Sequence, residues 1–335
     1  MSLATKRENN FDALRLVFAI FVIFSHAYAL VGKTEPVLLG RTLGNLGVHG
    51  FFVISGYLIV KSKLNSSSSF YVISRALRIL PGLVVALYIA NLIGNLAHHF
   101  EHNPVPQITD GPVWTLPWEA ICYLLVLVFG IIGGLVKSSY PAVLIALWSY
   151  FIVGSITGNV DPFFLAILPM ILVFFSGGLL QIANFKPSLL TLIPALIGIF
   201  LTFKYSIFLI FYNHIYQYFP LWNSPQYWKG PWVPAIFIHT TIYFLCFPLL
   251  VISAGLFSQL KIKLSHDISY GVYIYAWPVS QTLIFFGEKH SYKWNPLALA
   301  ISTLVIVIPI AYLSCRLIEE PFMRLKDSAT FRKLK

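Results

Sequence analysis

The sequence predicts an all-α integral membrane protein, a single domain over residues 1–335 with about ten transmembrane helices. Two observations carry this prediction. Hydrophobic residues make up 58% of the chain and charged residues only 10%, with a mean hydropathy of +0.78, whereas soluble domains contain roughly 25% charged residues. Apolar runs near the roughly 20 residues needed to cross a bilayer also recur along the whole chain.

The apolar runs follow one another with short polar connections. They lie at 11–31, 47–61, 79–97, 119–136, 141–157, 162–184, 188–211, 234–255, 268–287 and 297–317. The first run is too long for the apolar part of a cleavable signal peptide, so we expect it to remain as the first span. Several others are short, and we expect those helices to be tilted or partly re-entrant.

The distribution of basic residues predicts the orientation. With the N-terminus inside, ten spans place 17 of the 23 Lys and Arg residues on the side of the two termini and 6 on the other. This asymmetry obeys the positive-inside rule and predicts that both termini are cytoplasmic. The net charge of +11 has the same explanation. Nucleic acid is not an expected partner, because no basic stripe with interleaved aromatic residues stands outside the apolar runs.

The cysteines do not predict a metal centre. Cys122, Cys246 and Cys315 all lie in apolar runs and have no paired spacing, which argues against a disulfide framework or a cysteine-based metal site. We therefore expect no metal.

The first apolar run contains Arg15 and His26 on one helix face. Their separation of 11 positions corresponds to a rise of about 16 Å. An ionisable side chain at membrane depth is a functional candidate by default. The alternative for His26 is a hydrogen bond to a neighbouring helix. Asp12 precedes Arg15 by three residues, so the two side chains can pair in the first turn.

Further candidates lie in the next two segments. The second run contains Ser55 and Tyr57, and its glycines at 47, 50 and 56 favour close helix packing, which explains most of these glycines. Ser55 is a candidate nucleophile without an adjacent base in the sequence. Arg75 and Arg78, three residues apart, share a helix face and suit phosphate binding. Ordinary positive-inside anchoring explains the two arginines as well.

Polar and aromatic residues also stand at the edges of later runs. Trp114 and Glu119 precede the fourth span on the outer side, where they indicate either an interfacial belt or a carboxyl that assists proton transfer. The nearby His98, His99 and His102 could form a weak metal site, but a polar loop is the simpler reading. Tyr270 and Tyr273 begin the ninth run, and their hydroxyls need partners inside the protein.

Taken together, these segments resemble the acyltransferase 3 family of membrane acyltransferases. The matching motifs, in chain order, are Phe-Asp-x-Leu-Arg with Arg-x10-His, Gly-Val-x-x-Phe-Phe-x-x-Ser-Gly-Tyr, Arg-x-x-Arg followed by Pro, Trp-Thr-Leu-x-x-Glu, Ser-Tyr-Gly-x-Tyr and Glu-x-Pro-Phe. They run from residue 11 to residue 322. One position departs from the family: many members have a histidine where this chain has Ala276, so any role of that histidine is absent or supplied by another residue.

The resemblance implies a multi-pass enzyme of the bacterial inner membrane. It implies acyl transfer, usually of acetyl from acetyl-CoA as co-substrate, to a hydroxyl of a cell-surface polysaccharide or lipid-linked glycan. On this reading Arg15, Arg75 and Arg78 bind the CoA phosphates. His26 acts as general base or transient acyl carrier, and Glu119 assists.

The aromatic segment 204–232 is the expected acceptor surface, although an interfacial girdle explains its composition equally well. Two rival readings remain: a polytopic transporter or glycan flippase without acyl transfer, and a structural or partner-binding membrane subunit.

Overall fold

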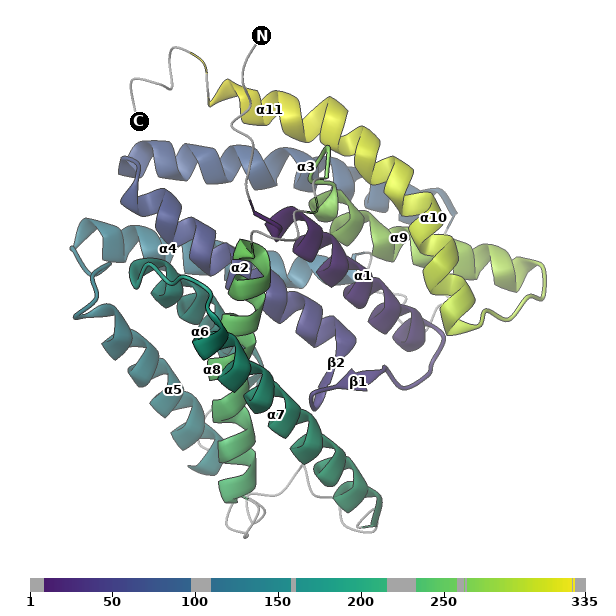
Figure 1. The fold of residues 1–335 in the computed structure, drawn as a ribbon. Coiled ribbons are helices and arrows are strands. Elements are labelled where there is room, and N and C mark those ends of the chain that lie inside the picture. The colour runs from purple at the N-terminus through teal and green to yellow at the C-terminus, as the bar shows by residue number, and fades with distance from the viewer. Residues whose placement is uncertain are drawn as a thin grey trace.

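Helices form nearly all of the described structure (Figure 1). The computed structural model describes residues 9–97, 110–157, 161–215, 233–257, 262, 264–326 and 328. Each of the ten predicted apolar runs overlaps one long helix. Their bounds are α1 Phe11–Leu30, α2 Leu43–Leu64, α3 Ser68–Ala97, α4 Leu116–Ile131, α5 Tyr140–Thr157, α6 Pro162–Ile182, α7 Leu189–Ile215, α8 Val233–Leu256, α9 Ser269–Lys289 and α10 Pro296–Ser314.

Short elements connect some of these helices. A hairpin of β1 Val37–Leu38 and β2 Arg41–Thr42 lies between α1 and α2, and a 3-10 helix, η1 Gly111–Thr115, leads directly into α4. A π-helical turn, Cys315–Glu319, joins α10 to α11 Glu320–Leu325 without a break. The last span is therefore longer than the apolar run 297–317 indicates.

Local sequence explains where several helices begin. The side chains of Thr42, Asp161 and Asn295 accept hydrogen bonds from backbone amides in the first turns of α2, α6 and α10. These residue types are the preferred N-caps, and proline follows Asp161 and Asn295 at the first helical position.

Several helices carry large apolar side chains on their outer faces. Leu190 is 88% exposed and Leu317 is 71% exposed. In a helix that faces lipid this pattern is stable, whereas in water such an exposed apolar surface would promote aggregation. Six helical segments in the described part of the chain are long and apolar enough to cross a membrane. The structure thus supports a multi-pass membrane protein, and the count of ten spans with cytoplasmic termini stays a prediction.

Helix α2 lies at the centre and packs against α1 on one side and α6 on the other. The α2–α6 contact is close because both helices present glycine there. A Cβ atom at Gly56 would lie 1.8 Å from the carbonyl oxygen of Phe174, and one at Gly177 would lie 2.2 Å from that of Val53. The prediction that glycines of the second run serve close packing is confirmed.

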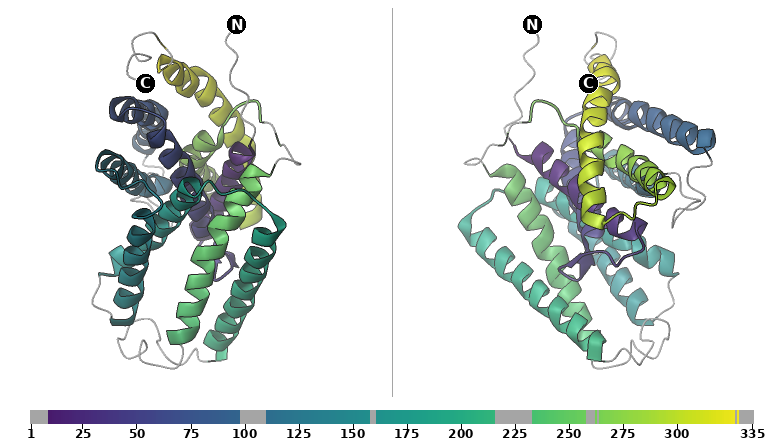
Figure 2. Two further views of the ribbon diagram at one scale, coloured as in Figure 1. Left: turned by 60° about the vertical axis from the view of Figure 1, so that its left-hand side comes forward. Right: turned by 90° about the vertical axis from the view of Figure 1, so that its right-hand side faces the viewer.

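The remaining helices gather around this centre. Helices α1, α9 and α10 pack together on one side of α2, and α7 and α8 lie side by side on the other. Figure 2 shows α7 and α8 extending away from the end of the molecule that contains α11. Helix α3 lies across that end, beside α9 and α11 (Figure 1).

Candidate active site

A polar cavity of about 270 Å³ opens between α1, α2, α3, α4 and α9. Asn9, Met323 and Lys326 line it too, so the beginning of α1 and the end of α11 meet at this cavity. Of the eleven site residues predicted from the sequence, eight line it. They are Asp12, Arg15, Ser55, Arg75, Arg78, Glu119, Tyr270 and Tyr273.

Asp267, just before α9, binds two of the predicted arginines. Its Oδ2 accepts hydrogen bonds from Arg15 Nη1 at 3.2 Å and Arg78 Nη2 at 2.7 Å. Its Oδ1 accepts a bond from Ser269 Oγ at 2.5 Å. Arg15 also contacts Asp12 at 3.3 Å, as the spacing predicted. The network joins α1, α3 and α9 at one wall of the cavity.

The ionisation of Asp267 follows from these contacts. Burial by itself raises the pKa of a carboxyl, but Arg78 and Arg15 hold the pKa of Asp267 well below its usual range. Asp267 is therefore a permanent anion that fixes two cations. The sequence analysis did not single it out, because it stands outside the apolar runs and nothing local marks its partners.

Arg75 differs from the other two arginines. It is partly buried and lines the cavity, but within the described residues it has no ion pair, and its Nε is buried without a hydrogen-bond partner. A buried guanidinium without a carboxylate is costly unless an anion joins it. Arg75 is the cation of this cavity that remains available to a ligand.

Glu119 lies in the same cavity. Its Oε1 accepts hydrogen bonds from Ser55 Oγ at 2.7 Å and from Tyr123 Oη at 2.5 Å. The prediction that Glu119 stands on the opposite face from Arg75 and Arg78 is wrong. Thr115 at the end of η1 is buried, and α4 follows it directly, so that Thr115, Leu116 and Glu119 all line the cavity. The structure also gives Ser55 a neighbouring carboxylate that its sequence context does not show.

Thr115 and Tyr273, which line the cavity, belong to a layer of contacting residues. Tyr273 Oη is 2.8 Å from Thr115 Oγ1 and donates to the Pro112 carbonyl at 3.1 Å. One turn further along α9, the Trp277 ring lies so close to Gly111 that a Cβ atom there would be 2.9 Å from it. We call Pro112, Thr115, Tyr273 and Trp277 the inner layer.

His26 lies beyond the inner layer. Its ring is partly buried and meets the Trp277 ring edge-on, with 4.9 Å between centroids. His26 does not line the cavity, and the structure does not bring it into contact with Glu119. The edge-on contact fixes the plane of the imidazole. His26 and Arg15 lie on one helix with the inner layer between them.

The remaining predicted residues lie elsewhere. Tyr57 is buried against Phe11, with 5.6 Å between ring centroids, and serves packing. Trp114 is half exposed on η1 and does not line the cavity. Ala276 is buried in α9 beside Trp277. The expected acceptor segment 204–232 and His98, His99 and His102 lie largely or wholly outside the residues whose side chains the structure describes.

Asp110, which the sequence analysis passed over, stands at the start of η1. Both of its carboxyl oxygens are buried, and neither has a hydrogen-bond partner among the described residues. Burial raises the pKa of Asp110 to about 8. Such a carboxyl holds its proton at neutral pH. Its position next to Gly111 places it beside the inner layer.

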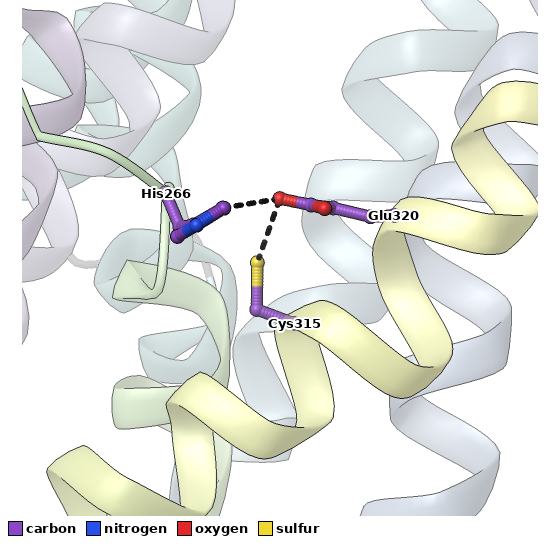
Figure 3. Close-up of side chains that lie close together, drawn as sticks. All are labelled: His266, Cys315 and Glu320. Atoms are coloured by element: carbon purple, nitrogen blue, oxygen red, sulfur yellow. Dashed lines mark hydrogen bonds and ion pairs between the residues drawn. The ribbon is translucent and has the colours of Figure 1, made fainter.

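A second cluster joins the Asp267 segment to the last helix. Ligand atoms of His266, Cys315 and Glu320 lie within 4.8 Å of one another (Figure 3). The Glu320 carboxylate contacts the His266 ring, and Arg316 and Arg324 at 3.3 and 3.6 Å. Because two guanidinium groups already neutralise Glu320, we assign the cluster a structural role: it anchors the residue preceding Asp267. Within the described residues, no other group of this kind offers a metal site.

Comparison with known proteins decides the family. The pattern of the acyltransferase domain of the acyltransferase 3 family matches residues 8–316, which include His26 and all the cavity-lining residues except Met323 and Lys326. The chain belongs to the acyltransferase 3 family. This membrane acyltransferase is 29% identical over 354 residues to an O-acetyl transferase of Shigella phage Sf6, covering 95% of this chain and 96% of the relative.

A second relative is the nodulation protein 10 of Rhizobium leguminosarum bv. viciae. It is 27% identical over 385 residues, covering 98% of this acyltransferase and 96% of the relative. No solved structure matches the chain.

Proposed function

We propose that this acyltransferase transfers acetyl from cytoplasmic acetyl-CoA to a hydroxyl of a cell-surface polysaccharide or lipid-linked glycan at the bacterial inner membrane. The observation that supports the proposal most directly is the cavity itself. It gathers three arginines at one end and leads, behind the inner layer, to the histidine of the first helix.

The donor fits the cavity because the cavity has basic residues for the phosphates and apolar walls for the pantetheine arm. Arg75, which has no ion pair among the described residues, binds a CoA phosphate, and Arg78 and Arg15 add positive charge held in place by Asp267. Apolar side chains of α2, including Phe51 and Phe52, line the walls below them. The uncharged pantetheine arm follows this wall, which brings the thioester to the inner layer.

His26 then acts on the acceptor. The imidazole takes the proton of the acceptor hydroxyl while the oxygen attacks the thioester carbonyl. The new C–O bond forms, the C–S bond breaks, and the thiolate of CoA takes the proton back from the imidazolium. In the variant route the acetyl group rests first on the imidazole and then passes to the hydroxyl. Either route requires the inner layer to admit the thioester.

Glu119 supports the donor side of the reaction. Its carboxylate holds Ser55 and Tyr123 in fixed positions on the wall that the pantetheine arm follows. Ser55 has a base within reach and is the alternative acyl acceptor. Replacing Ser55 with Ala separates the two assignments, because activity persists if His26 is the reactive group.

Membership in an acyltransferase family does not favour the rival transporter or flippase. A purely structural subunit would tolerate loss of His26, Arg75 and Arg78. Labelled acetyl-CoA distinguishes these readings directly, because only the enzyme forms an O-acetyl product from it.

The test uses membrane vesicles that contain the acyltransferase, labelled acetyl-CoA and a panel of glycans. The wild-type chain is expected to give a labelled, alkali-labile ester on at least one glycan, and H26A none. The control is H290A, which removes an exposed histidine at the end of α9. Equal labelling by H26A and wild type, at equal amounts of protein, would refute the role of His26. Absence of label with every glycan would refute the donor or the acceptor class.

A further inference from the structure

A fourth arginine lies apart from the cavity, on the hairpin between α1 and α2. The Arg41 guanidinium lies over the ring of Tyr243, 4.6 Å from its centroid, and 5.6 Å from that of Phe244. The Tyr243 hydroxyl is in turn 2.8 Å from His49 Nδ1. Arg41 therefore points inward against α8 and does not extend into water.

Nothing in the described part of the chain neutralises this charge. Arg41 has no ion pair there, and its Nε is buried without a hydrogen-bond partner. Burial lowers the pKa of the guanidinium, although arginine remains charged at any physiological pH. Contact with an aromatic face returns less free energy than the desolvation of an ion costs. Arg15 and Arg78, by contrast, share Asp267.

An apolar groove begins beside Arg41. It has a volume of about 420 Å³ and lies between α5, α6 and α8. Phe244 belongs to both features, since it lines the groove and faces the guanidinium. From Thr241 to Leu249 the groove follows α8 for about 12 Å. Its other walls include Trp148, Leu179 and Leu245, so the groove is suited to hydrocarbon.

We propose that Arg41 binds the phosphate of a membrane lipid whose hydrocarbon chain lies in the groove between α5, α6 and α8. A phosphate supplies the anion that Arg41 lacks, and a chain covers apolar side chains such as Leu245, which is 63% exposed. One ligand with a charged head and an apolar tail accounts for both features.

The site lies at the same end of α1 as His26. Gly44 packs on Ser25, the neighbour of His26, and Gly44 follows Arg41 by three positions in the chain. If the proposed function holds, the bound lipid is the carrier of the glycan acceptor, with its sugar held near the catalytic histidine. This last step rests on the proposed function, whereas lipid binding does not.

The experiment measures binding without acetyl-CoA, so its failure is separate from a failure of acyl transfer. Purified acyltransferase in detergent is titrated with decaprenyl phosphate, with decaprenol and with inorganic phosphate, and bound ligand is read by native mass spectrometry. Wild type is expected to bind decaprenyl phosphate at least about 10-fold more tightly than decaprenol, since a charge-assisted bond contributes about 1.5–3 kcal/mol.

Two variants and two matched controls test the head and the tail separately. R41Q is expected to bind decaprenyl phosphate no better than decaprenol, and K289Q, which removes an exposed charge on α9, to bind like wild type. L245W obstructs the groove and is expected to weaken both lipids, whereas L190W, on an exposed position of α7, is not.

Thermal unfolding shows whether each variant is folded. If R41Q is not folded, R41K replaces it, and R41K is expected to bind decaprenyl phosphate more weakly than wild type because an ammonium group lacks the bidentate contact of the guanidinium. Equal affinity of wild type for decaprenyl phosphate and decaprenol would overturn the proposal. So would unchanged binding in R41Q, or inorganic phosphate that binds as tightly as the lipid.

Discussion

Asp267 shows how one residue can set the geometry of a site that other residues were predicted to form. Its carboxylate is the shared partner of Arg15 and Arg78, and Ser269 fixes its second oxygen. Sequence reasoning found both arginines from their spacing. It could not find Asp267, because the contact joins residues 252 positions apart in the chain.

Replacing Asp267 with Asn is expected to destabilise the protein strongly. Removing one member of a buried charge network leaves the other charges without compensation, which typically costs 3–5 kcal/mol. D267N should therefore unfold at a clearly lower temperature in detergent, and D267E should recover part of the loss. The control is E288Q on an exposed position of α9. A melting temperature of D267N equal to that of E288Q would contradict the assigned role.

Asp110 is expected to make the folded protein less stable as pH rises. Its pKa of about 8 in the folded protein exceeds the ordinary value of 3.8, so the folded state binds the proton more tightly than the unfolded state. The stabilisation from this group is complete below the ordinary pKa and is lost as pH rises through 8. The slope contributed by one proton is at most about 1.4 kcal/mol per pH unit.

The matching variant is D110N, which cannot ionise. Melting temperatures measured from pH 5 to pH 9 should fall more steeply with pH for wild type than for D110N, because other groups titrate alike in both. Parallel curves would show that Asp110 does not carry a raised pKa.

At the scale of helices, hydropathy located all ten long helices but misplaced some of their ends. The third apolar run begins at 79, whereas α3 begins at Ser68 and contains Arg75 and Arg78 within the helix. Because arginines are polar, a hydropathy pattern assigns the segment that contains them to a connection between spans. In the structure they face a cavity between helices, where their charge is directed away from lipid.

The glycines of α2 explain why this helix could be predicted to pack closely against its neighbours. Its glycines allow backbones to approach, and the two closest points are Gly56 and Gly177. The partner helix could not be predicted, because small residues show that a helix packs closely without indicating against what. The contact with α6 depends on the arrangement of the whole bundle.

G56A is expected to destabilise the protein, because the added methyl group would lie 1.8 Å from a backbone oxygen that cannot move aside easily. A loss of about 1–3 kcal/mol is typical of such overpacking. G134A is the matched control, since a Cβ atom there has its nearest neighbour at 3.5 Å, an ordinary contact. If both variants melt at the same temperature, the close α2–α6 contact is not as the structure describes it.

At the scale of the whole molecule, the sequence predicted a helical membrane acyltransferase, and the fold and the family agree. Eight predicted site residues from five helices line one cavity, which spacing alone could not show. Two spatial relations were not predictable. Glu119 joins the arginines and not the outer face, and His26 is separated from the cavity by Trp277. Both depend on contacts between helices that are distant in the sequence, which no local pattern marks.

In the proposed function the arginine-lined cavity binds the donor and His26 performs the chemistry. Acetyl transfer measured against acetyl-CoA concentration, with CoA binding measured in parallel, tests both parts in wild type, R75Q and H26A. R75Q should raise the KM for acetyl-CoA about 10-fold or more with kcat nearly unchanged, because a phosphate contact is lost.

H26A should lower kcat by about 10²-fold or more while CoA binding stays as in wild type. A KM unchanged in R75Q would contradict the donor site, and a kcat retained in H26A would contradict the catalytic role of the histidine.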